Sequence, residues 1–217
     1  DMLQTNTTLN EFDISFNKLN NMNVPFLADG IKNNETLASV NILNNDIGAE
    51  QANKLIQIME SKSNLQTLCG FSGDETQLDL SNTGLTTGCA VLVANEVKNN
   101  GALATLDISD NKLCGLFSDG SGTYNGAGIE ALSEALKRNT SLKTLRMSKT
   151  YIGPTGAQVL ADGLTANGAM VTVNVMGNKI GKEQLSKLQE MMQAHLMLVS
   201  LCGIADDATE ANLSGLG

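Results

Sequence analysis

The sequence predicts an α/β solenoid, in which short parallel strands line the inner face of a curved structure and helices cover its outer face. A phrase of the form L-x-x-L-x-L-x-x-N-x-L at residues 103–113 recurs along the chain. Most successive copies of the phrase begin 28 residues apart. Between the copies, apolar residues follow the spacing of one helix face. Each repeat is therefore expected to be one strand followed by one helix.

The phrase keeps its period except at two places. Steps of 28 residues join positions 9, 37 and 65, positions 75 and 103, and positions 142, 170 and 198. Ten residues separate positions 65 and 75, and 39 separate positions 103 and 142, so we predict insertions at 69–77 and 114–124. The copies begin at Leu9, Leu37, Glu75 (which lacks the first leucine), Leu103, Leu142 and Met170, and an incomplete copy begins at Leu198.

A trio of apolar residues at i, i+3 and i+7 follows each phrase and marks one face of an α-helix. Each predicted helix can bury this stripe only against its neighbours, so the units are expected to stack. The trios are Val24/Leu27/Ile31, Ala52/Leu55/Met59, Ala90/Val93/Val97, Ile129/Leu132/Leu136, Ala157/Leu160/Leu164 and Leu185/Leu188/Met192.

The phrase itself explains how a unit is built. Its second and third leucines lie two residues apart, so they point to the same side of a strand and into the core. The residues between them face outward. The Asn of the phrase is expected to bond backbone groups in the turn that leaves the strand, where the sheet offers no partner.

On these residues the chain resembles the ribonuclease-inhibitor class of leucine-rich repeat proteins, and the resemblance covers nearly the whole sequence. It implies a curved solenoid. It does not imply one activity, because the class includes enzyme inhibitors, GTPase-activating proteins, immune-receptor sensor domains and actin regulators. The function we expect is a non-enzymatic protein–protein interaction scaffold or recognition module, which includes the case of a subunit of a larger assembly. A GTPase-activating protein of the Ran-directed type and an inhibitor of a basic enzyme are the alternatives.

The length of 217 residues accommodates one domain, residues 1–217, of about seven units. Neither end of the sequence resembles a polar capping repeat, so we expect a fragment of a longer protein or ends that partners cover. The sequence has no apolar run long enough for a membrane span and no signal peptide at its start. Four dispersed cysteines without a CxxC pair fit free thiols in a reducing compartment, so an intracellular, cytoplasmic location is expected.

The charge is uneven along the chain. Residues 1–121 hold 15 acidic and 6 basic residues, whereas residues 122–217 hold 8 of each, so the whole net charge of −9 lies in the first part. Such a surface repels nucleic acid and favours a protein partner with a basic surface, although acidic residues also serve solubility alone.

The two insertions have different sequence features. Residues 65–81 align with residues 198–214 at a shift of 133, which indicates a longer repeat that contains the first insertion. The second insertion, 114–124, is glycine-rich, but its spacing departs from a phosphate-binding loop, and Tyr124 stands where a calcium loop needs Gly. Neither cysteine pattern nor the single His195 indicates a catalytic or zinc site. We therefore predict no cofactor and no metal.

The outward positions of the strands give the candidate binding residues. The column at the centre of the strands runs Asp13, Asn41, Asp79, Asp107, Arg146 and Asn174, and Asp110 and Lys149 lie close by. An acidic patch at Asp79, Asp107 and Asp110 would then meet the basic Arg146 and Lys149, and this boundary could set the register of a docked protein. Exposed strand positions are also polar for solubility, which is the alternative interpretation. The sequence shows no aromatic cluster on this face.

Overall fold

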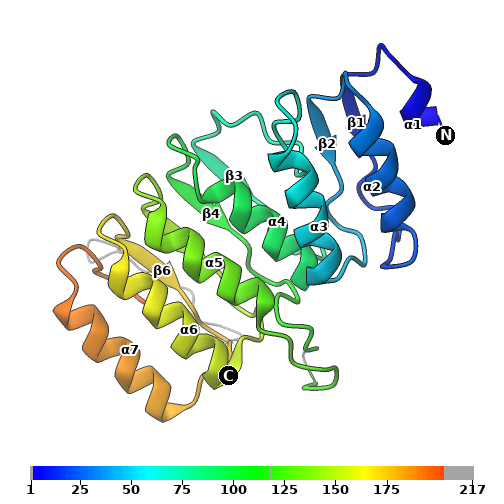
Figure 1. The fold of residues 1–217 in the computed structure, drawn as a ribbon. Helices are drawn as coiled ribbons and strands as arrows, with labels where there is room; N and C mark the ends of the chain where they lie inside the picture. Colours follow the sequence, from blue (N-terminus) through cyan, green and yellow to red (C-terminus); the bar gives the residue numbers. More distant parts are fainter. Residues whose placement is uncertain (1, 118, 203–217) are drawn as a thin grey trace.

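The computed structural model describes residues 2–117 and 119–202, in which strands and helices alternate as the phrase predicts. Figure 1 shows the helices side by side along one face of the chain and the strands behind them. In chain order the elements are α1 (Met2–Thr5), β1 (Glu11–Asp13), α2 (Val24–Asn33), β2 (Ser39–Asn41), α3 (Ala49–Glu60), β3 (Gln77–Asp79), α4 (Thr87–Val97), β4 (Thr105–Asp107), α5 (Ala127–Arg138), β5 (Thr144–Arg146), α6 (Gly153–Ala166), β6 (Thr172–Asn174) and α7 (Lys182–Ala194).

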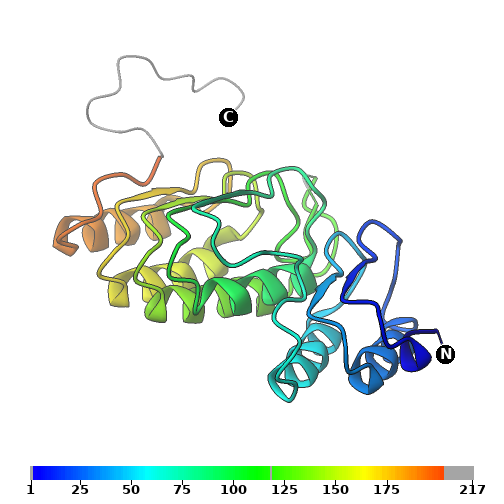
Figure 2. The same cartoon turned by 90° about the horizontal axis from the view of Figure 1, so that it is seen from above.

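The strands are parallel and stay in the register of the phrase. Leu106 of β4 pairs with Leu78 of β3 and Leu145 of β5, and Leu145 in turn pairs with Val173 of β6. Within the described residues this four-stranded sheet is separate from a two-stranded sheet of β1 and β2. Figure 2 shows the first two strand–helix units offset from the row formed by the later ones. The solenoid is therefore divided between β2 and β3.

The first insertion causes this division. Residues 65–69, and not β3, lie beside β2: the N–H of Val40 donates to Thr67 O at 3.0 Å and that of Ile42 to Leu68 O at 3.1 Å. The outer edge of this segment is closed by a side chain of α4, Glu96. Its carboxylate accepts hydrogen bonds from Leu68 N at 2.6 Å, Cys69 N at 2.9 Å and the Thr67 hydroxyl. A carboxylate thus replaces the strand that would otherwise continue the sheet.

The core lies between the sheet and the helices and is built from the predicted apolar stripes. Each of the first five trios has a member that is at most 1% exposed: Ile31, Leu55, Val97, Leu136 and Leu160. The phrase leucines of the central units are likewise buried. The last trio is different, because Leu185 on α7 is 43% exposed while Leu188 is buried. The stripe of α7 is thus only partly covered.

Asparagine side chains join neighbouring units, as the phrase predicts. Asn111 is buried, accepts hydrogen bonds from Gly84 N at 3.0 Å and Leu85 N at 2.9 Å, and donates to three carbonyls of its own and the preceding unit. Asn45 and Asn178 bond their turns in the same manner. These side chains satisfy backbone groups that the short strands leave without partners.

A second row of side chains joins the units at the opposite rim, where helices end. Asn167 donates to Leu136 O and Asn139 O and accepts from Ala169 N and Met170 N. His195 takes this place in the last described unit: its Nε2 contacts Asn167 O and its Nδ1 accepts from Leu198 N at 2.9 Å. The ring therefore has a structural role in the described part of the chain. None of the described helices is long and apolar enough to cross a membrane.

Candidate protein-binding surface

The predicted central column exists, but in two parts. Asp13 and Asn41 lie side by side on β1 and β2. Asp79, Asp107, Arg146 and Asn174 follow one another in register on β3, β4, β5 and β6. The expected continuity between Asn41 and Asp79 is wrong, because residue 69 pairs with Asn41 and the sheet stops there. Residues 67–69, which end at the first residue of the insertion, occupy the place beside β2 that the column gave to β3.

The carboxylates and amides of this column share a local structural role. Each strand ends at the column residue, so the N–H group two residues later has lost its sheet partner. Asp13, Asp79 and Asp107 each accept that N–H from a following serine at 2.9 Å. Asn41 and Asn174 accept the equivalent N–H at 3.2 and 3.1 Å. Aspartate and asparagine therefore recur here partly because they complete the strand end.

At Asp79 and Asp13 this role also favours the charged form of the carboxylate. Hydrogen bonds from the side chain and backbone of Ser81 lower the pKa of Asp79, and Ser15 does the same for the pKa of Asp13. Only one carboxylate oxygen of Asp79 and of Asp107 accepts these bonds from the described residues. The second oxygen of each is available to a partner.

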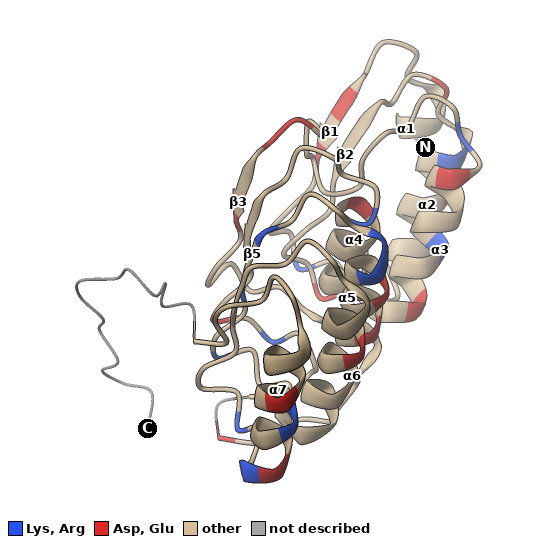
Figure 3. Cartoon of the chain, turned by 90° about the vertical axis from the view of Figure 1, so that its left-hand side faces the viewer, with Lys and Arg blue, Asp and Glu red and all other residues tan. Residues whose placement is uncertain are grey.

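Arg146 is the one member of the column that cannot accept a hydrogen bond. The N–H of Ser148 instead donates to Ser109 Oγ at 3.2 Å. The arginine side chain is exposed and lies beside Asp107 in the register of β4 and β5. The ion pairs among the described residues are all between neighbouring turns of single helices, so Arg146 is in none of them. We call Asp79, Asp107 and Arg146 the inner patch; Figure 3 shows the acidic and basic residues along the strands.

Asp110 and Lys149 occupy adjacent turns that leave β4 and β5. Both have left-handed backbones, with φ of 56° and 52°. The N–H of Asp110 donates to Ser148 O and that of Lys149 to Met176 O, each across to the next unit. The Lys149 side chain lies over Gly177, where an added Cβ would come within 2.8 Å of Lys149 Cγ. The lysine therefore leans toward the following turn, on the side away from Asp110.

The second insertion follows the turn that leaves β4 and folds back on itself. Leu116 and Gly122 form an antiparallel bridge, and Asn125 N donates to Cys114 O at 2.9 Å. The Lys112 Nζ lies 4.1 Å from the centre of the Phe117 ring, a cation–π contact. Phe117 and Met22 line a groove of about 490 Å³ between this insertion and the first units.

The surroundings of Cys69 and Cys114 do not activate their thiols as nucleophiles. Burial raises the pKa of the Cys69 thiol well above its usual value, and burial raises the pKa of Cys114 to about 11. A nucleophilic thiol needs the opposite shift. The described residues contain no group of three or more His, Cys, Asp or Glu side chains that could hold a metal ion.

Exposed apolar residues in the first unit were missed by the sequence analysis. Phe16, Met22 and Phe26 are 66%, 80% and 78% exposed. The signal was present in the phase of Phe16, which stands where later units have Asn44, Asn82 and Asp110, all in left-handed turns. A bulky aromatic in such a turn has no local reason to be there.

Comparison with known proteins agrees with the fold. A family described as leucine-rich repeat matches residues 5–21 and 138–161. The human "NACHT, LRR and PYD domains-containing protein 13" is 25% identical over 167 residues, which are 75% of this chain; the chain spans 14% of that protein's length. The structure of the leiomodin-1 actin-binding site 2 superposes with a TM-score of 0.50 at 12% identity, over 62% of this chain and 73% of that one.

These matches do not divide the repeat family into classes, so the ribonuclease-inhibitor class stays a prediction. The repeated phrase, the parallel strands that alternate with helices and the asparagine side chains that join the units agree with the matches in one respect. The chain has the α/β solenoid fold of leucine-rich repeat proteins.

Proposed function

We propose that the chain is a non-enzymatic protein–protein interaction module that binds its partner through the inner patch. Leucine-rich repeat relatives support interaction with proteins in general. The observation that carries the finer proposal is the inner patch itself: Asp79 and Asp107 stand in register with Arg146 on an open sheet, and none of the three is in an ion pair with a described residue. Charges that a fold leaves without partners on an accessible face are available to a docked surface.

The surroundings of the patch favour a broad contact over a small-molecule site. The preceding outward positions on β4, β5 and β6 are Thr105, Thr144 and Thr172, all half-buried. Short hydroxyl side chains keep the sheet accessible and can bond a polar partner. The partner we expect presents basic residues to Asp79 and Asp107 and an acidic residue to Arg146. Asp13, Asn41, Asp110, Lys149 and Asn174 form the margin of the same surface.

A capture experiment with a charge-matched control tests this proposal. The immobilised chain is crosslinked to partners from native extract, beside an Asp79→Lys/Asp107→Lys variant. An Asp29→Lys/Asp162→Lys variant, changed on the exposed outer helices α2 and α6, carries the same net charge. We expect the partner to be lost only from the inner-face variant. Equal capture by all three proteins would exclude the inner patch, and equal loss from both variants would reduce the interaction to net charge.

A further inference from the structure

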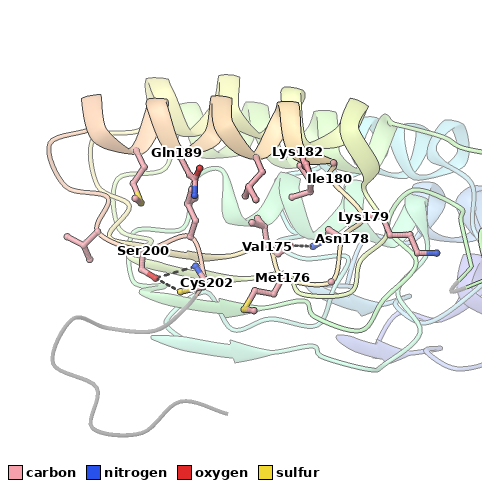
Figure 4. Close-up of a pocket in the computed structure, with 15 residues that line it drawn as sticks. Val175, Met176, Asn178, Lys179, Ile180, Lys182, Gln189, Ser200 and Cys202 are labelled. Atoms are coloured by element: carbon pink, nitrogen blue, oxygen red, sulfur yellow. Dashed lines mark hydrogen bonds between the residues drawn. The ribbon is translucent and has the colours of Figure 1, made fainter. Parts of the chain in front are cut away.

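A groove of about 770 Å³ lies at the C-terminal end of the described solenoid. Helix α7 forms one side, and residues 175–181 and 199–202 form the other (Figure 4). Its lining is mostly apolar and includes Val175, Ile180, Leu185, Met192, Val199 and Leu201. Leu185 and Val199 are 43% and 47% exposed, which is unusual for side chains of the helix stripe and of the strand region.

An equivalent surface lies 133 residues earlier in the chain. There, residues 65–69 pair with β2 as residues 198–202 pair with β6. The Val173 N–Ser200 O bond of 2.9 Å repeats the Val40 N–Thr67 O bond of 3.0 Å. The bonds Cys202 N–Ser200 Oγ and Cys69 N–Thr67 Oγ, and the parallel and antiparallel bridges on either side, also repeat. The two surfaces are built alike, down to the backbone.

At the earlier copy the surface is covered by α4, and its contacts are specific. The hydroxyl of Thr86, which caps α4, donates to Ile47 O at 3.1 Å. Gly88 packs so closely that an added Cβ would lie 2.2 Å from the same oxygen. At the second-last residue of the helix, Glu96 accepts the N–H groups of Leu68 and Cys69. A hydroxyl, a close glycine and a carboxylate thus seat the helix on this surface.

Among the residues that the structure describes, no helix covers the equivalent groups at the later copy. Leu68 and Cys69 are 1% and 3% exposed under α4, whereas Leu201 and Cys202 are only half-buried. The Leu201 N–H donates to no described residue, and that of Cys202 donates only to Ser200 Oγ among them. Two N–H groups beside an apolar groove are the arrangement that Glu96 and its helix satisfy in the first copy.

We propose that this groove is the docking site of a leucine-rich strand–helix unit in phase with the 133-residue repeat. Its helix lies on α7 as α4 lies on α3, and its carboxylate accepts the N–H groups of Leu201 and Cys202. The groove differs from the earlier one at Leu185, which stands in place of Ala52, so the incoming helix offers a smaller side chain there. The inference does not rest on the inner-face proposal, because the groove contains no residue of the inner patch.

The test uses the chain's own covering unit. Gly217 is the sequence equivalent of Gly84, so residues 85–101 are fused directly after Gly217 in the full chain. The readout is alkylation of Cys202, located by mass spectrometry; Cys69, Cys89 and Cys114 are buried internal references. A second fusion also carries Leu185→Ala, which restores the alanine of the earlier copy. It makes room for the side chain that the fused helix presents at this position, so the test stays valid if the first fusion fits poorly.

We expect either fusion to slow alkylation of Cys202 toward the rate of Cys69. Glu96→Ala within the fused copy should raise the rate about tenfold, because hydrogen bonds to a charged group contribute at least about one tenfold step in the closed equilibrium. Glu96→Gln in the same place should retain protection, because an amide oxygen also accepts N–H groups.

Three results would contradict the proposal. Unchanged alkylation of Cys202 in both fusions would show that such a unit does not dock in the groove. Protection of Cys202 in the unfused chain that increases with protein concentration would assign the groove to a second copy of this chain. Equal protection by the Glu96→Ala fusion would remove the carboxylate from the proposal. Capture of a partner by the inner patch is measured separately and is unaffected by any of these outcomes.

Discussion

Replacement of Glu96 by alanine should loosen the solenoid where its two sheets meet. The carboxylate is the acceptor for Leu68 N, Cys69 N and the Thr67 hydroxyl, and all three residues are at most 5% exposed. After Glu96→Ala the Cys69 N–H keeps Thr67 Oγ at 3.0 Å, but the Leu68 N–H loses its acceptor.

The magnitude follows from these contacts. A buried N–H without an acceptor costs about 1–3 kcal/mol, and loss of the other charged hydrogen bonds adds about 1–2 kcal/mol. Part of this loss is offset, because the removed carboxylate was itself unfavourably buried: desolvation raises the pKa of Glu96. We expect a net loss of about 2–4 kcal/mol in the free energy of unfolding, or about 5–12 °C in Tm for a chain of this size.

The assay combines urea unfolding, followed by circular dichroism, with amide hydrogen exchange. Exchange should accelerate first at Leu68 and Cys69, because the loss is local to that edge. Glu60→Ala, at the exposed end of α3, is the matched control and should leave both readouts unchanged. A Glu96→Ala protein with the unfolding midpoint and the Leu68 exchange rate of the unchanged chain would refute the assigned role of the carboxylate.

The pH dependence has a sign that separates Glu96 from the strand-end aspartates. The folded pKa of Glu96 is raised, so its charge opposes folding above that pKa, and the penalty disappears as the pH falls to the ordinary glutamate range. The folded pKa of Asp13 is lowered, so its contribution is present above the ordinary aspartate pKa and is lost as the pH falls through the folded value. We therefore compare the urea midpoint of each variant, Glu96→Gln and Asp13→Asn, with that of the unchanged chain across pH. The two differences in midpoint should change with pH in opposite senses.

Three further predictions concern the joints between units. Gly88→Ala forces a Cβ against Ile47 O and should lower the free energy of unfolding by about 1–3 kcal/mol. Gly101→Ala, with open space around it, is the control and should be tolerated. Equal urea midpoints for the two variants would contradict the close packing of α3 and α4. Asn111→Ala orphans several buried backbone groups and should cost about 3 kcal/mol in the same assay; a neutral result would remove the asparagine row from the account. His195→Asn should preserve thermal stability and His195→Ala should lower it, and a loss in both would require a role beyond the backbone bonds described.

The periodic features could be predicted from the sequence because their causes are local and repeat. The helix stripes, the strand positions and the bonds of Asn111 depend only on the phase of a residue within the unit. The role of His195 could be inferred in the same way, since it shares the phase of Asn139 and Asn167. The strand-end role of the aspartates was also visible, because Asp13, Asp79 and Asp107 are each followed two residues later by serine.

The division of the sheet could not be predicted from the phrase. It depends on Glu96, which lies on a helix about 28 residues after the backbone that it bonds and belongs to no repeated pattern in the shorter unit. The step of 28 from position 37 to position 65 placed residues 67–69 in phase with β2, but the phrase did not indicate that the sheet would end there. The exposed stripe of α7 was missed for a related reason: the trio Leu185/Leu188/Met192 has the helical spacing whether or not a neighbour covers it.

The claim that the inner patch is the binding surface is tested most directly by a hydrogen-exchange footprint of the chain with its captured partner. We expect slower exchange at residues 77–81, 105–110 and 144–149, with the outer helices α2 to α6 unchanged. Slower exchange confined to those helices, with the three inner segments unchanged, would contradict it.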